Sequence, residues 1–79
     1  MQHIQTLIAQ AREWAEPAEL QLEVTYNWGM AIASIVDVRT AMVVTDLMNS
    51  FWLTVSRRTM AEAVADLNEM IRVILEKDS

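Results

Sequence analysis

Residues 19–28, "ELQLEVTYNW", alternate between polar and apolar side chains without a break. A period of two places every second side chain on one side of an extended chain, so this segment is typical of a half-buried β-strand. The apolar side comprises Leu20, Leu22, Val24, Tyr26 and Trp28. Asn27 and Gly29, the only glycine of the chain, then predict a hairpin turn. The chain therefore needs a sheet with one covered face.

The following segment, residues 30–55, is mostly apolar but contains Asp37, Arg39 and Asp46. On a helix its polar residues would scatter around the whole circumference and bury charges, so we expect strands. Alternation places Val36, Val38, Thr40, Met42 and Val44 on one face, with Asp37, Arg39 and Thr45 on the other. Phe51, Leu53 and Val55 repeat the pattern after a loop at residues 45–50. The alternative is a long central helix buried in an oligomer, since one glycine and one proline are few for several turns.

Both ends of the chain show helical periodicity. Residues 3–16 carry an apolar stripe of Ile4, Leu7, Ile8, Ala11, Trp14 and Ala15, and Pro17 ends this helix. Thr59 and Glu62 form a capping box that begins a second helix. Its apolar stripe comprises Met60, Ala63, Val64, Leu67, Met70, Ile71 and Ile74.

These elements predict one α+β domain over residues 1–79, in the order α-β-β-β-α. Both helices would cover one face of an antiparallel meander, and the alternative is an all-α helical oligomer. In this arrangement Ala31, Ala33 and Ile35, joined by Trp52, lie on the other face, which a second copy or a partner would cover. Trp14 and Trp28 lie on apolar stripes, so we expect them in the core.

The composition points to association with proteins. Hydrophobic residues make up 53% of only 79 residues, more than so small a core can bury, so we expect a homodimer. The net charge of −5 disfavours nucleic acid and suits a basic protein partner. The absence of cysteine, of a signal peptide and of a long apolar run predicts a cytoplasmic protein that does not enter a membrane.

No set of residues predicts catalysis, a cofactor or a metal site. His3 is the only histidine and lies in a terminus that we expect to fray. A phosphate-binding loop needs more than one glycine. Glu62, Asp66 and Glu69 lie along one exposed helix face, which offers no cleft for acid–base chemistry but could contact a basic partner.

Arg57 and Arg58 precede a helix N-terminus, where the helix dipole disfavours positive charge. We expect two solvated arginines that assist solubility; the alternative is that an acid from a partner, or a bound anion at the helix end, compensates their charge. An exposed Trp52 beside a charged rim would be a binding hot spot.

The segment "RTMAEAVADLNEMIRVILE", about a quarter of the chain, resembles the strand-to-helix region of HicB-type antitoxins in Thr59, Glu62, Ala63, Leu67, Glu69 and Ile71. The chain departs from that pattern because Ser56, Arg57 and Arg58 replace the glycine-rich turn, and because a helix precedes the strands. The α-β-β-β-α order is also similar to double-stranded-RNA-binding domains, but the basic start of their last helix is missing here.

We therefore expect a non-enzymatic protein-binding module that covers a surface of a target protein, as an inhibitor, antitoxin or chaperone does. The alternative is a structural subunit of a larger assembly. The candidate partner-binding residues are Ile35, Trp52, Arg57, Arg58, Glu62, Asp66 and Glu69.

Overall fold

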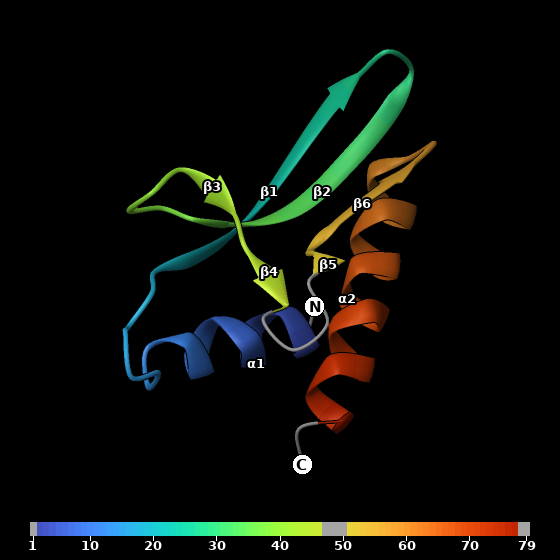
Figure 1. Ribbon diagram of the computed structural model, residues 1–79. Coiled ribbons are helices and arrows are strands. Elements are labelled where there is room, and N and C mark those ends of the chain that lie inside the picture. Colours follow the sequence, from blue (N-terminus) through green and yellow to red (C-terminus); the bar gives the residue numbers. More distant parts are fainter. Residues whose placement is uncertain (1, 47–50, 78–79) are drawn as a thin grey trace.

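The computed structural model describes residues 2–46 and 51–77 (Figure 1). Along the chain the elements are α1 (Gln2–Ala11), β1 (Leu20–Asn27), β2 (Met30–Asp37), β3 (Met42–Val43), β4 (Thr45–Asp46), β5 (Phe51–Trp52), β6 (Thr54–Arg57) and α2 (Met60–Lys77). All strand pairs are antiparallel, and both helices pack on the same face of the main sheet. The predicted α+β fold class is confirmed, and the all-α alternative is wrong.

Strand β2 is the centre of the main sheet. Strand β1 pairs with it along its whole length, from Asn27 opposite Met30 to Leu20 opposite Asp37. The other edge of β2 is shared, because β6 pairs with residues 31–34 and β3 pairs with residues 36–37. β3 and β6 are therefore two halves of one third strand.

An inserted hairpin separates these two halves. At the point of insertion, the amide of Ile35 donates to the carbonyl of Leu53 (2.9 Å), and the carbonyl of Ile35 accepts from the amide of Val44 (2.8 Å). The amide of Leu53 donates to the carbonyl of Val44 (2.9 Å), and β4 pairs with β5 beyond this point. Figure 1 shows β4 leaving the sheet toward the helices. Residues 45–46 of the predicted loop are thus strand, and residues 47–50 lie outside the described part.

The register of the first hairpin decides which side of β2 faces the helices. Leu22 lies opposite Ile35 and Val24 lies opposite Ala33, and directly opposed residues share a face. Because the apolar side of β1 faces the helices, the side of β2 that carries Ile35 must face them too. Ala31, Ala33 and Ile35 are accordingly 0% exposed. The predicted exposed apolar face is wrong, and Ile35 is a core residue rather than a partner contact.

The face of the sheet without helices is largely polar. Its members on β1 are Gln21, Glu23 and Thr25, all exposed, and on β2 they are Ile32, Ser34 and Val36. The hydroxyl groups of Ser34 and Thr54 are hydrogen-bonded across β2 and β6 (2.8 Å). This face therefore lacks the apolar surface that we expected a second copy to cover.

The cause of the error is a turn at residues 38–41, inside the segment predicted as a strand. The carboxylate of Asp37 accepts from the amide of Arg39 (3.0 Å), and the carbonyl of Asp37 accepts from the amides of Thr40 (3.2 Å) and Ala41 (2.8 Å). Ala41 has a φ of 58°, a conformation for which glycine is the usual residue. The alternating pattern of the sequence continues through this turn, although the strand does not. Following the alternation therefore placed the wrong side of β2 toward the helices.

Helix α1 is shorter than predicted, ending at Ala11 rather than at residue 16. The amide of Ala18 donates to the carbonyl of Ala11 (3.1 Å), which reverses the chain so that Ala18 and Leu20 join the core. Trp14 lies in the reversed segment and is 37% exposed, so its predicted place in the core is wrong.

The N-terminus of α1 is capped by a side chain of α2. The first amides of a helix have no partner within the helix. Here the amides of His3 (3.0 Å) and Ile4 (3.1 Å) both donate to the side-chain oxygen of Asn68. The expected frayed terminus at His3 is therefore held in place by a tertiary contact.

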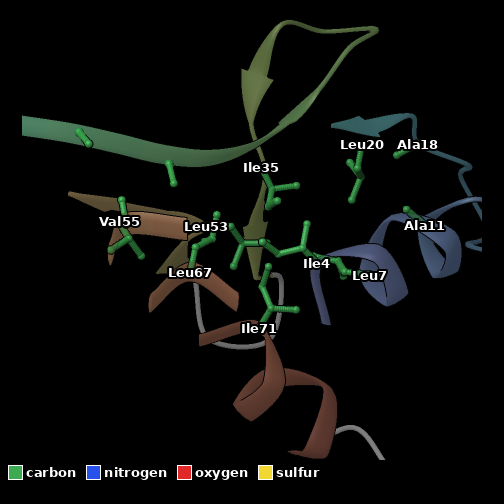
Figure 2. Close-up of a cluster of buried hydrophobic side chains, with 13 residues drawn as sticks. Ile4, Leu7, Ala11, Ala18, Leu20, Ile35, Leu53, Val55, Leu67 and Ile71 are labelled. Atoms are coloured by element: carbon green, nitrogen blue, oxygen red, sulfur yellow. The ribbon is translucent and has the colours of Figure 1, made fainter. Parts of the chain in front are cut away.

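Helix α2 begins as predicted. The hydroxyl of Thr59 accepts from the amide of Glu62 (3.1 Å), which confirms this half of the capping box. Ala63, Leu67 and Ile71 are 0% exposed and pack into one core with residues of α1 and the sheet. Figure 2 shows this core, with Leu67 and Ile71 of α2 lying near side chains from α1 and from the sheet. The members drawn and labelled there include Ile4, Leu7, Ile35, Leu53 and Val55.

The burial of Ile35 gives a first prediction. Ile35→Ala should lower the free energy of unfolding by about 2–5 kcal/mol, because it leaves a cavity in the core. The matched control is Val36→Ala, on the half-buried outer face of the same strand. Urea unfolding measures both. Equal losses in the two variants would contradict the observed orientation of β2.

The cap by Asn68 gives a second prediction. Asn68→Ala should lower the free energy of unfolding by about 1 kcal/mol, as the loss of other helix caps does. It should also speed hydrogen exchange at the amides of His3 and Ile4. Asn68→Asp keeps an acceptor oxygen and serves as the control. Unchanged exchange at these two amides in Asn68→Ala would show that the cap does not hold α1.

Candidate protein-binding surface

The positive charge before α2 is compensated within the chain. Arg57 donates from Nε to the carboxylate of Asp66, one of the acids of α2, and from Nη1 to the carbonyl of Ser56 (2.7 Å). Arg58 is exposed beside it. The predicted acid from a partner is therefore not needed for Arg57, since the helix itself supplies one.

A second ion-pair group lies further along α2. Arg72 donates from Nε to Glu69 (2.8 Å) and from Nη1 to Glu76 (2.7 Å). The hydrogen bond from Arg72 lowers the pKa of Glu69 below its ordinary value and raises the pKa of Arg72. Exposed pairs of this kind stabilise a fold only weakly. Of the three acids proposed to face a partner, Asp66 and Glu69 thus have partners in their own chain, and Glu62 is exposed.

All three tryptophans of the chain are exposed, and they lie in two regions where other exposed apolar side chains accompany them. One is the turn of the β1–β2 hairpin, with Tyr26, Trp28 and Met30, which we call the hairpin tip. The other surrounds a hollow that Trp14, Met42 and Trp52 help to line. Met30 and Asp37 mark the two ends of β2, about 23 Å apart at the usual rise of a strand, so the two regions are separate.

The hairpin tip presents a tryptophan in a strained conformation. Trp28 and Gly29 have φ values of 55° and 74°, which identify a two-residue turn of the primed type. That turn favours Asn-Gly, and a left-handed conformation costs an ordinary residue about 1–2 kcal/mol. Trp28 is nevertheless 93% exposed, so it gains little from burial within the chain. Figure 1 shows this turn far from α1, at the opposite end of the molecule.

The hollow lies at the other end of β2 and has a volume of about 300 Å³. Its lining residues are Trp14, Asp37, Thr40, Met42, Val43, Val44 and Trp52. Trp52 is 53% exposed, in agreement with its predicted place at the surface. Asp37 is the one ionisable group among these described lining residues, and its side chain is 16% exposed. The hollow is therefore apolar, with a single half-buried carboxylate.

Within residues 2–46 and 51–77, no three acidic or histidine side chains come together as they would around a metal ion. Every buried polar side-chain atom of this part of the chain has a hydrogen-bond partner. Neither described helix is both long and apolar enough to cross a membrane.

Comparisons with known proteins give no relative. No family model, curated protein or solved structure matches the chain. Neither the resemblance to HicB-type antitoxins nor that to double-stranded-RNA-binding domains gains support from them.

Sequence reasoning placed Trp14 and Trp28 in the core, and the structure exposes both. A signal for Trp28 was present, because a two-residue turn that ends on Gly29 must include the residue before it. For Trp14 the sequence offered no such signal. Its exposure follows from the early end of α1, where the amide of Ala18 donates to the carbonyl of Ala11.

The pair of Glu69 and Arg72 gives a third prediction. Because the pKa of Glu69 is lowered in the folded chain, the pair stabilises the fold above the ordinary glutamate pKa and ceases to do so as the pH falls through the lowered pKa. Arg72→Gln should return the pKa of Glu69 toward its ordinary value. Titration of the Glu69 carboxyl resonance by NMR measures this, with Lys77→Gln as the control. An unchanged pKa in Arg72→Gln would contradict the assigned cause.

Proposed function

We propose that the chain is a non-enzymatic protein-binding module. It would cover a surface of a target protein in the cytoplasm, as an inhibitor, antitoxin or chaperone does. The observation that carries this proposal is Trp28, which is 93% exposed at a hairpin turn in a conformation that disfavours it. A side chain that weakens the fold and has almost no burial in its own chain is best explained by burial against a partner.

The chemistry of the hairpin tip suits such a contact. Tryptophan is the residue most enriched among the side chains that dominate binding energy at interfaces. No charged residue occurs between Val24 and Val36, so burial of the tip would remove no charge from water. Tyr26 and Met30 extend the apolar surface on either side of the turn. The tip therefore has the composition of an interface core rather than of a solvated loop.

The rest of the surface bears on the choice of partner. The chain carries a net charge of −5, while the tip itself is uncharged. A target with a basic rim around an apolar pocket would be attracted to the chain and oriented by it. A homodimer remains part of the proposal, but the sheet face first chosen for it is polar. The exposed apolar regions at the tip and the hollow are the surfaces left for it.

The second candidate function is a structural subunit of a larger assembly. The exposed apolar regions are compatible with this function too, because neighbouring subunits would bury them just as a target protein would. Size-exclusion chromatography with light scattering separates the two. A monomer or a discrete dimer supports the binding module, and large assemblies of the isolated chain support the subunit.

Trp28→Asn provides the test of the binding module. Asparagine before Gly29 suits the turn. The free energy of unfolding of the variant should therefore be about 0.5–2 kcal/mol higher than that of the natural chain. The same change should abolish capture of specific partners, identified by mass spectrometry after a pull-down from cell lysate. Stability and binding would thus move in opposite directions at one residue.

The control for this experiment is Val73→Ala, which removes an exposed apolar side chain from α2, away from the hairpin. It should retain every partner that the natural chain captures. Recovery of the same proteins by Trp28→Asn, or a loss of stability in that variant, would count against the role proposed for Trp28.

A further inference from the structure

We propose that the hollow between Trp14 and Trp52 binds an arginine side chain of a partner segment. This inference concerns a second site and does not depend on the role of Trp28. It rests on three features of the hollow: its two tryptophans, its half-buried carboxylate and its apolar walls.

The tryptophans make the hollow suitable for a cation. Trp14 comes from the segment after α1, and Trp52 comes from the inserted hairpin, so two distant parts of the chain bring indole rings to one cavity. Tryptophan attracts cations more strongly than other aromatic side chains do. A planar, weakly hydrated guanidinium stacks on aromatic faces better than an ammonium group does, which favours arginine over lysine.

Asp37 supplies the charge that a guanidinium would meet. Its Oδ1 atom accepts from the amide of Arg39 and lies 3.8 Å from Nε of the same residue, a loose ion pair. The side chain of Arg39 is 55% exposed, so it shields this carboxylate only in part. Oδ2 has no hydrogen bond within the described residues, which leaves it able to accept one from a bound cation.

The remaining walls suit the aliphatic part of the same side chain. Met42, Val43 and Val44 line the hollow with apolar groups, against which three methylene groups can pack. The volume of about 300 Å³ is at the lower end for ligand sites, so the hollow suits one long side chain rather than a large cofactor. The net charge of −5 would draw a basic segment to the surface.

The experiment titrates the full chain with N-acetyl-Ala-Arg-Ala-amide and follows the indole N–H signals of the three tryptophans by NMR. The signals of Trp14 and Trp52 should shift, while that of Trp28 stays in place. A peptide with citrulline in place of arginine has the same shape without the charge, and it should bind at least about tenfold more weakly. Binding should also weaken as salt is added.

Two variants complete the test. Asp37→Asn keeps the oxygen that accepts from the amide of Arg39, so the turn is preserved while the charge is lost; it should weaken binding by about tenfold or more. Trp52→Ala should weaken it similarly, and the amide spectrum of each variant reports whether the fold is intact. Trp28→Asn is the matched control and should bind the peptide normally.

Three results would overturn the proposal. Equal binding of the citrulline peptide would show an apolar hollow without a cation site. Shifts of Trp14 and Trp52 that depend on protein concentration, and that the peptide does not alter, would show that a second copy occupies the hollow. An unchanged affinity in Asp37→Asn would remove the carboxylate from the site.

Discussion

The close packing of α2 against the middle of the sheet is the contact on which the rest of the structure depends. Ala31 and Ala33 of β2 and Ala63 of α2 are all 0% exposed. Small side chains let a helix lie close to a sheet, and the larger Leu67 and Ile71 then reach the core beside them. α1 in turn depends on α2, since Asn68 caps its first turn. A chain of 79 residues thus obtains one continuous core, to which α1, α2 and the sheet all contribute.

The position of this core explains why the hairpin tip is exposed. The inward residues of β1 lose cover from one end to the other: Leu20 is buried, Val24 is half-buried and Tyr26 is exposed. Figure 1 shows the hairpin extending away from α1, so α1 does not cover its turn. The apolar alternation continues to the end of β1 although its cover does not. This mismatch supports the proposal that a partner completes the cover.

The two exposed apolar regions differ in a way that bears on their partners. The hairpin tip is uncharged and protrudes, which suits insertion into an apolar pocket. The hollow is concave and contains Asp37, which suits a basic side chain. The acids of α2, by contrast, are largely paired with Arg57 and Arg72. Both proposed binding surfaces therefore lie at the ends of β2 rather than on the charged face of the helix.

Local patterns in the sequence determined the elements, whereas tertiary contacts decided which surfaces they expose. The alternation of residues 19–28 and the cap at Thr59 specify β1 and the start of α2, because each depends only on neighbouring residues. Gly29 likewise specifies the hairpin turn. The sequence could not show the orientation of β2, the early end of α1 or the hairpin inserted between Val44 and Leu53. The inserted hairpin depends on the hydrogen bonds of Ile35 with Val44 and Leu53, and the other two depend on irregular turns at residues 38–41 and 11–18; such bonds leave no periodic trace in the sequence.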